Sequence, residues 1–456
     1  MPAESYDLIV LGAGSGARDG AQKAAREFGA SVALVESTRW GGSCPNVACK
    51  PTKAYVVAAE LLHEINSLAG VLGIEVGPAR ANLAKIKARK DELVAPQESW
   101  IKRLGDAGFT TVDGTAAFVD PRTVRVGDRE LSAERIMIAT GSRTATPPIE
   151  GLTDAGWVDH VSALELTEVP ESLLVVGGGP VGLELAQVFS RFGSRVTLVQ
   201  GAARITPRSD ADASDELAAS LADEGIEILT ETRVGRVTAQ DGSIVATLTS
   251  PNGGSPGQRR IAQILLASGR HPNVEELELD RVGVEQTPRG ITVDQRLRTT
   301  TEGIWAAGDV TGLAQFTPIA QYQARIAIDD MFGRNGSAAD YSLLPTAIFT
   351  EPELAGIGLT EGQAREQGLA VGVVKHPVSS VQRAAYTNTR RGLYKIVFDR
   401  QSRRVLGVHA VCPNASDVIQ GLTVALRLRA TVDDLAHAHH AFPTFGEGLK
   451  AAAEQA

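Results

Sequence analysis

A glycine-rich turn between a short apolar strand and a helix occurs twice, and it constrains the fold of this chain more than any other feature. The small residues are Gly12, Gly14 and Ala17 in the first copy and Gly177, Gly179 and Gly182 in the second, 165 residues later. Apolar runs beginning at Leu8 and Leu173 precede the two turns. Such glycines allow a tight turn and bring the N–H groups of a helix start close to a pyrophosphate. The chain is therefore predicted to contain two nucleotide-binding units.

The residues that follow the second strand of each unit suggest which nucleotide is bound. Glu36 lies 22 residues after Gly14, where a carboxylate can accept hydrogen bonds from a ribose. In the second unit Gln200 occupies the corresponding place, with Arg204 and Arg208 close behind. A missing acid with arginines nearby favours a 2′-phosphate, although both arginines can equally be surface residues. One dinucleotide needs one unit, so a flavin plus a nicotinamide nucleotide, with NADPH favoured over NADH, is the economical interpretation.

Two of the three cysteines in 456 residues lie in the stretch WGGSCPNVACKPTK, as Cys44-x4-Cys49. In a regular helix this spacing would place the Cα atoms roughly 8.5 Å apart. A disulfide needs about 4.4 to 6.8 Å. A bridge therefore requires a distorted helix start, and Pro45 and Pro51 are the residues that would break its hydrogen bonding. The alternative is two reduced cysteines that pack as small apolar side chains.

Composition excludes several functional classes. The net charge is −9, which favours neither nucleic acid nor an anionic membrane as a partner. We find no basic, apolar leader before Tyr6 and no apolar run approaching 18 residues, so a cytoplasmic protein is expected. In a reducing compartment a close cysteine pair is more often catalytic than structural.

The remaining elements are predicted from periodicity and punctuation. An amphipathic helix is expected from Pro51 to about Ser67, and one long charged, solvated helix from about Ala81 to Leu104. Short strands follow, and RIMIATGS would carry the chain past a bound nucleotide at Thr140, Gly141 and Ser142, although taken alone it could be the end of any strand. LLASGRHPN, from Leu265, mirrors that motif. Asp309 follows a buried strand, where it could bind the ribityl chain of a flavin or simply cap a helix.

These motifs, together with GIWAAGDVTG and in this order, resemble the class I pyridine nucleotide-disulfide oxidoreductases, which include glutathione reductase, lipoamide dehydrogenase and mercuric reductase. The resemblance covers essentially the whole chain. It implies an α/β fold with two Rossmann-like nucleotide-binding domains plus a C-terminal α+β dimerisation domain, FAD and NAD(P) as cofactors, and an obligate homodimer. The implied domains are residues 1–150 (FAD-binding), 151–272 (NAD(P)-binding), 273–340 (central FAD part) and 341–456 (dimerisation).

The resemblance also implies residue roles. Cys49 would face the flavin as a thiolate, Cys44 would meet the substrate, and Lys53 and Glu184 would form an ion pair beside the flavin N5. The implied FAD contacts are Gly12, Gly14, Ser15, Glu36, Gly42, Ser43, Lys53, Ala116, Thr140, Gly141, Ser142 and Asp309. The implied nicotinamide-nucleotide contacts are Gly177, Gly179, Gly182, Glu184, Gln200, Arg204 and Gly269.

One departure from the family lies near the end, in HAHHAFPTFGEGLKAAAEQA. Most members carry a histidine before the proline, as the acid and base for thiol exchange. Here that residue is Phe442, which cannot move protons, whereas Glu447, which would orient the histidine, is retained. A catalytic role for His439 or His440 is the alternative to a solvated one.

The functional hypothesis is an FAD enzyme that draws hydride from NAD(P)H and reduces an acceptor through Cys44 and Cys49, similar to mercuric reductase. The two thiolates would then bind a soft metal ion such as Hg(II) transiently. The C-terminal cysteine pair that delivers mercuric ion in those enzymes has no counterpart before the chain stops at Ala456. The alternatives are a lipoamide-dehydrogenase-like or low-molecular-weight disulfide reductase, and an FAD-binding redox sensor without turnover.

Overall fold

The computed structural model describes residues 3–251, 257–334, 336 and 338–456, and the chain divides into two compact units. Unit 1 holds residues 1–53, 89–145 and 269–340, and unit 2 holds residues 54–88, 146–268 and 341–456. Each glycine turn therefore lies in its own unit. The predicted division into four domains stays a prediction.

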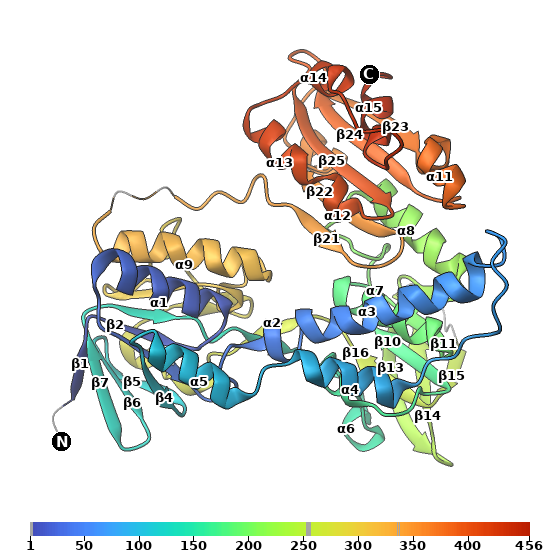
Figure 1. Cartoon of the computed structure of the whole chain (residues 1–456). Coiled ribbons are helices and arrows are strands. Elements are labelled where there is room, and N and C mark those ends of the chain that lie inside the picture. Colours follow the sequence, from blue (N-terminus) through green and yellow to red (C-terminus); the bar gives the residue numbers. More distant parts are fainter. Residues whose placement is uncertain (1–2, 252–256, 335, 337) are drawn as a thin grey trace. The chain divides into compact units, whose positions relative to one another are not determined.

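A five-stranded parallel sheet forms the centre of unit 1 (Figure 1). In spatial order its strands are β20 (Ile304–Ala306), β8 (Ile136–Ile138), β2 (Leu8–Leu11), β3 (Val32–Glu36) and β4 (Thr110–Asp113). The strands β2 and β8 are uninterrupted apolar runs because both faces of this sheet are covered. Helices α1 (Ser15–Phe28) and α9 (Thr317–Met331) lie side by side over one face.

The opposite face of this sheet packs against a second, four-stranded sheet, through Leu11 and Phe118 among others. Its strands are β1 (Glu4–Tyr6), β7 (Arg129–Ala133), β6 (Thr123–Val126) and β5 (Ala116–Asp120). The smaller elements of unit 1 are α2 (Ser43–Asn46), α5 (Gln97–Asp106) and the strand pairs β9 (Ser142–Thr144) with β17 (Arg270–Pro272) and β18 (Gln286–Thr287) with β19 (Gly290–Ile291).

The described residues of unit 2 form three sheets. The parallel sheet has the order β12 (Glu227–Leu229), β11 (Arg195–Val199), β10 (Ser172–Val176) and β16 (Gln263–Leu266). A three-stranded antiparallel sheet follows, with β13 (Arg233–Gln240), β14 (Ser243–Thr249) and β15 (Gly257–Ile261). The C-terminal antiparallel sheet has the order β21 (Thr346–Ile348), β22 (Glu353–Gly358), β25 (Val405–Cys412), β24 (Leu393–Asp399) and β23 (Val371–Pro377).

The helices of unit 2 are mostly short, and two longer ones flank the parallel sheet. These two are α7 (Pro180–Arg191) and α8 (Ala211–Asp223). The others are α6 (Leu152–Ala155), α10 (Glu361–Glu366), α11 (Gln382–Tyr386), α12 (Ala415–Val418), α13 (Gln420–Arg427), α14 (Val432–His437) and α15 (Glu447–Ala453). The helices α3 (Cys49–His63) and α4 (Leu83–Leu93) each begin in one unit and end in the other.

The single charged helix predicted from Ala81 to Leu104 is wrong in two respects. It is two helices, α4 and α5, because Pro96 ends the hydrogen-bond pattern and serves as the N-cap of α5. It is also more than a solvated face, since Leu83, Lys90 and Leu104 are buried. The turn between the two helices lets α5 approach the segment from Trp40 to Cys49, which we call the cysteine loop.

Candidate active site

The first glycine turn leaves open space in front of a helix start. Gly12 has φ +109°, and a Cβ there would lie 2.3 Å from the carbonyl oxygen of Ala139, so no other residue fits. Gly14 is the N-cap of α1, has no side-chain cap, and an added Cβ would meet nothing within 4 Å. The first N–H groups of a helix have no acceptor within that helix, so the start of α1 is suited to bind the FAD pyrophosphate.

Glu36 is held beside this turn at the end of β3. Its Oε2 accepts a hydrogen bond from the Ala13 N–H (2.9 Å), and its Oε1 accepts from the Thr38 N–H and hydroxyl (both 2.9 Å). Oε1 also accepts from the Arg39 N–H (3.1 Å), so of the roughly four acceptor positions of a carboxylate the one left for a ribose hydroxyl is on Oε2. The position of Glu36 fits its predicted role.

A second polar group lies where β8 and β20 end next to each other. The Ser142 hydroxyl donates to Asp309 Oδ2 (2.7 Å), and Arg270 Nε donates to the Ser142 Oγ (2.7 Å). Arg270 also lies 3.5 Å from the Asp309 carboxylate. Asp309 therefore belongs to a polar cluster, although it also opens a short 3-10 helix. Arg270 was missed by the sequence argument, which took only the neighbouring Gly269 from the motif LLASGRHPN.

Three more residues predicted to contact FAD lie in this unit, and two of them are close to Ser142. Thr140 is tied down through its hydroxyl, which donates to the Asn273 carbonyl oxygen (2.7 Å), and Asn273 donates back to the Thr140 carbonyl (3.0 Å). Gly141 has φ +72° with open space around its Cα, whereas Ala116 is buried at the start of β5. Thr140 and Gly141 thus lie beside the Ser142 cluster, while Ala116 belongs to the core.

The cysteine loop rests directly on the first glycine turn. A Cβ on Gly42 would lie 2.4 Å from the Cα of Gly14, and one on Gly41 would lie 2.7 Å from the Trp100 ring. Both glycines have positive φ, +75° and +91°. This contact brings Ser43 and Cys44, at the start of α2, next to the turn that would hold FAD. Trp100, on α5, is a second residue that the sequence argument missed.

The helix is interrupted between the two cysteines, as a close pair requires. α2 ends at Asn46 and α3 begins at Cys49, with Val47 at φ −139° between them. Pro51 has no N–H to donate to the Val47 carbonyl, so a continuous helix cannot pass through this point. The Asn46 side-chain amide closes the turn by donating to the carbonyl oxygens of Trp40 (2.9 Å) and Gly42 (2.7 Å).

The two sulfurs are free thiols that share a hydrogen bond. That bond from Cys49 lowers the pKa of the Cys44 thiol to about 6, and the charges of Arg18 and Lys53 lower it further against the effect of burial. The same bond, with burial, raises the pKa of Cys49. Thr317 lies 3.8 Å from the Cys49 sulfur. The residues of this chain thus place the first negative charge on Cys44, and the predicted Cys49 thiolate stays a prediction.

This charge distribution predicts a pH profile for alkylation. In the reduced, FAD-free protein, iodoacetamide should label Cys44 with a midpoint near pH 6, because the thiolate is the nucleophile and its fraction rises with pH. Arg18→Gln should move the midpoint upward, since it removes a cation that favours the thiolate. Peptide mass spectrometry across pH 4 to 9 measures both. A midpoint near the ordinary cysteine value of about 8.5 in the unmodified chain would contradict the shift.

Cys412 provides an internal reference in that experiment. Its side chain is 0% exposed in the core of the C-terminal sheet, and burial raises the pKa of this thiol to about 12. It should remain unlabelled while Cys44 reacts.

The second glycine turn, in unit 2, repeats the geometry of the first. Gly177 has φ +116°, and its Cβ would lie 2.4 Å from the Ala267 carbonyl oxygen. Gly179 is the N-cap of α7, has no side-chain cap and faces open space. A Cβ on Gly182 would lie 2.0 Å from the Gly177 carbonyl oxygen, so the helix can approach the strand only through glycine. These residues fit the pyrophosphate of a nicotinamide nucleotide.

Gln200 and Arg204 lie together beyond β11. Gln200 Oε1 accepts a weak bond from the Gly178 N–H (3.4 Å), and its Nε2 donates to the Arg204 carbonyl oxygen (3.3 Å). The Arg204 guanidinium forms an ion pair with Asp215 on α8 (2.8 Å). Arg204 is half-exposed, so it can still reach an incoming phosphate, but Asp215 competes for it.

Four predicted residues remain outside these groups. Lys53 is on α3, and Glu184 is on α7, where its Oε1 accepts from the Phe349 N–H (3.0 Å). Their ion pair stays a prediction. The Phe442 side chain is 69% exposed, and Glu447 accepts a hydrogen bond from the Thr444 N–H (2.8 Å) at the start of α15.

The two histidines close to Phe442 are also exposed. His439 and His440 follow the end of α14. Among the described residues, no group of three or more histidine, cysteine and acidic side chains is arranged to hold a metal ion. No helix in the described parts of the chain is long and apolar enough to cross a membrane.

Comparison with known proteins places this geometry in context. Residues 6–324 match the pyridine nucleotide-disulphide oxidoreductase family, and residues 344–453 match the dimerisation domain of the same family.

Individual relatives are similar over nearly their whole length. The mercuric reductase of Streptomyces lividans is 37% identical over 98% of this chain and 96% of its own. The dihydrolipoyl dehydrogenase of Thermus scotoductus is also 37% identical, over 99% and 97% of the two chains. Among solved structures, the Cu(II) complex of the HOCl-induced flavoprotein disulfide reductase RclA from Escherichia coli superposes with a TM-score of 0.88 at 31% identity, covering 99% of both chains.

Proposed function

Because this chain belongs to the pyridine nucleotide-disulphide oxidoreductase family, it is an FAD enzyme that works with NAD(P)H, and we propose that it reduces its acceptor through Cys44 and Cys49. The observation that carries this proposal is the contact between Gly42 and Gly14, which seats the cysteine loop on the turn that fits FAD. When bound, FAD supplies two-electron transfer between the nicotinamide and the cysteine pair. Cys44 and Cys49 hold the electrons as a dithiol and release them on returning to a disulfide.

We propose a soft metal ion such as Hg(II) as the acceptor. Two thiolates at one helix start are suitable ligands for such an ion. Reduction of Hg(II) to the metal takes two electrons and no proton, so it needs no base at the position of Phe442. The similarity to mercuric reductases over nearly the whole chain supports this choice.

A dihydrolipoamide-dehydrogenase-like reaction is the second candidate, supported by the equally similar dihydrolipoyl dehydrogenase. Oxidation of a dithiol releases two protons, and Phe442 cannot accept them. This candidate therefore requires a different base, for which the exposed His439 and His440 are the nearest in sequence.

A panel of acceptors distinguishes the candidates. Steady NAD(P)H oxidation with Hg(II) plus excess thiol would support the metal ion, and fast NAD⁺ reduction by dihydrolipoamide would support the second reaction. If FAD-loaded protein turns over neither substrate, both candidate reactions are contradicted, and a redox sensor without turnover is the remaining function.

We propose NADPH as the electron donor, bound with its 2′-phosphate near Arg204. Arg204→Gln should then weaken NADPH binding by about tenfold, the usual effect of losing a hydrogen bond to a charged group, and leave NADH unchanged. Asp215→Asn is the matched variant, because it frees the guanidinium from its ion pair and should strengthen NADPH binding. Calorimetric titration with NADP⁺ and NAD⁺ measures these changes. An equal loss for both nucleotides in Arg204→Gln would rule out the phosphate contact.

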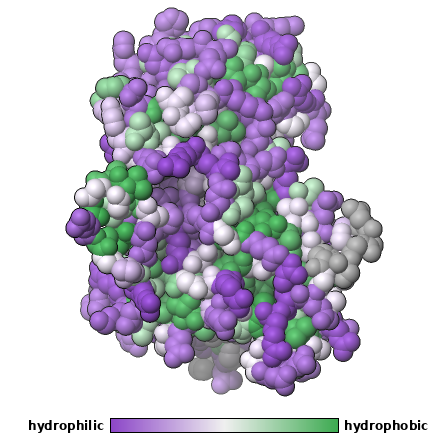
Figure 2. Space-filling view, turned by 90° about the vertical axis from the view of Figure 1, so that its right-hand side faces the viewer, coloured by the Kyte–Doolittle hydropathy of each residue, from purple (hydrophilic) through white to green (hydrophobic). Residues whose placement is uncertain are grey.

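The dimerisation domain, residues 344–453, supports a homodimer. Exposed apolar side chains also gather where α3 ends and in the segment after it, and they are Val57, Leu61, Val71, Leu72, Ile74 and Val76. Figure 2 looks at the side of the molecule where α3 ends and shows apolar patches between polar ones. A cluster of this kind is typical of a surface that another protein covers.

A further inference from the structure

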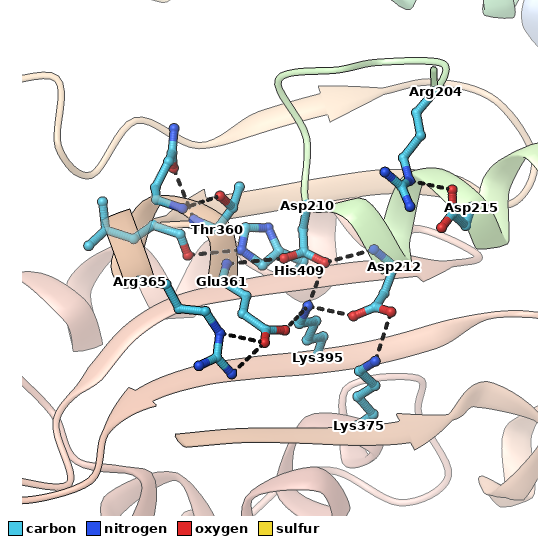
Figure 3. A network of polar contacts seen from close by, with 12 residues as sticks. Arg204, Asp210, Asp212, Asp215, Thr360, Glu361, Arg365, Lys375, Lys395 and His409 are labelled. Carbon is cyan, nitrogen blue, oxygen red and sulfur yellow. Dashed lines mark hydrogen bonds and ion pairs between the residues drawn. The ribbon is translucent and has the colours of Figure 1, made fainter. Parts of the chain in front are cut away.

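A buried lysine in the C-terminal sheet joins three carboxylates (Figure 3). Lys395 lies on β24 and is 1% exposed. Its Nζ contacts Asp210 (2.9 Å), Asp212 (2.5 Å) and Glu361 (2.8 Å). Asp210 and Asp212 stand at the start of α8, whereas Glu361 opens α10. Lys395 thus ties the C-terminal sheet to the first turn of α8.

The charges of this cluster balance in pairs. Asp212 has a second cation in Lys375 (2.7 Å), and Glu361 has one in Arg365 (2.7 Å). Asp210 is 1% exposed, and the only ion pair that the described residues make to it is the one with Lys395. His409 lies in the same cluster, and burial lowers the pKa of its ring, so it adds no charge at neutral pH. The pair of Lys395 and Asp210 is therefore the fully enclosed centre.

An enclosed ion pair contributes little net stability. Removing both charges from water costs about as much as their attraction returns, and apolar replacements are often neutral or stabilising. What such a pair does provide is a fixed geometry, because both ends must stay aligned to remain satisfied. The geometry that this pair determines is the position of Asp210.

Asp210 is the last residue of the loop that carries the proposed nucleotide contacts. Its side chain caps α8 by accepting from the Asp212 N–H (3.1 Å). One turn into α8, the Ser214 hydroxyl donates to the Ile205 carbonyl oxygen (2.6 Å). The adjacent Thr206 N–H donates to the carbonyl oxygen of Gly178, in the glycine turn (2.8 Å). The loop from Gln200 to Asp210 is thus held at both ends, by the glycine turn and by Lys395.

We propose that Lys395 is a positioning residue for the nicotinamide nucleotide, because it anchors Asp210 and so sets the loop that carries Gln200 and Arg204. It touches no substrate and acts through the start of α8, which it contacts at Asp210 and Asp212. The inference rests on the nucleotide site proposed above.

The test separates this link from general stability. Asp210→Asn keeps the cap on α8, removes the charge that Lys395 holds and loses the hydrogen bond that Asp210 Oδ2 accepts from the Glu361 N–H (3.2 Å). Lys395→Met with Asp210→Asn removes the enclosed pair and leaves Asp212 and Glu361 with their own cations. Calorimetry on the FAD-loaded dimer should show about tenfold weaker NADP⁺ binding in the double variant, within the range for coupling through a packed network, and a smaller loss in Asp210→Asn. KM for the nucleotide should rise while kcat at saturation stays within about twofold.

Lys375→Met is the matched control, since it removes an ion pair of the same cluster without touching Asp210. It should bind NADP⁺ as the unmodified chain does. Unchanged binding in Asp210→Asn and in the double variant, or an equal loss in Lys375→Met, would overturn the inference. If the double variant does not fold, Asp210→Asn alone decides. The affinity of the unmodified chain tests the nucleotide site by itself, so failure of that site and failure of this link give different results.

Discussion

Replacement of either Cys44 or Cys49 with serine is expected to lower acceptor reduction by at least about a thousandfold, because a single thiol can neither form nor reopen the disulfide. FAD content should be unchanged, since the glycine turn, Glu36 and the Ser142 cluster remain intact. Steady-state NAD(P)H oxidation with each acceptor measures the loss. Cys412→Ala is the matched control, because its thiol is buried in the core of the C-terminal sheet, and it should keep its activity.

The same two variants also distinguish the roles of the sulfurs. If Cys49 faces the flavin, its thiolate should give the two-electron-reduced enzyme a long-wavelength charge-transfer band. This band should persist in Cys44→Ser and vanish in Cys49→Ser. Stopped-flow reduction with NADPH records this band. The residues of the chain favour the negative charge on Cys44, so a band that survives only in Cys49→Ser would reverse the assignment. Bands of equal strength in both variants would contradict any assignment of separate roles to the two sulfurs.

Phe442→His should raise turnover of dithiol and disulfide substrates by roughly 100- to 10,000-fold, the usual contribution of a general acid and base. The substitution should cost little stability, because the Phe442 ring is 69% exposed and packs against little. Glu447 already lies five residues on, where the family resemblance expects a carboxylate to orient such a histidine. The rate of dihydrolipoamide oxidation by NAD⁺, measured as a function of pH, should acquire a limb near pH 6 to 7.

Phe442→Tyr serves as the matched variant, since it keeps the ring and has a hydroxyl whose pKa of about 10 is unsuited to this proton transfer. It should not reproduce the gain. No change in Phe442→His would mean that the proton acceptor lies elsewhere, and loss of the basal rate in His439→Gln or His440→Gln would then identify it. Reduction of Hg(II) should be unaffected by Phe442→His, because that reaction takes up no proton.

Much of the fold was predictable because its strands, turns and helices depend on short, local stretches of sequence. The strand that begins at Leu8 and the helix after the glycine turn were predicted where they occur, since a buried strand, a glycine turn and a helix start are local patterns. The positions of Glu36 and of the second glycine turn were predicted from residue spacing alone. The prediction of one long helix from Ala81 to Leu104 was wrong because it followed the run of charged residues and overlooked Pro96, which separates α4 from α5.

Residues that act through distant contacts could not be found in this way. Trp100 and Arg270 look like ordinary surface positions in the sequence, yet one supports Gly41 and the other holds Ser142 beside Asp309. Lys395 reads as one polar residue in an apolar strand, and only the fold brings it to Asp210, 185 residues away in the chain. No spacing rule connects such positions.

The sequence by itself therefore predicted two nucleotide-binding units and a redox-active cysteine pair, because each motif is complete within a short stretch of the chain. The tertiary structure alone decided that the cysteine loop rests on the first glycine turn, that Cys44 acquires the lower pKa, and that the C-terminal sheet reaches the nucleotide loop. These depend on which side chains meet across the fold, where a few ångströms determine charge, burial and hydrogen bonding.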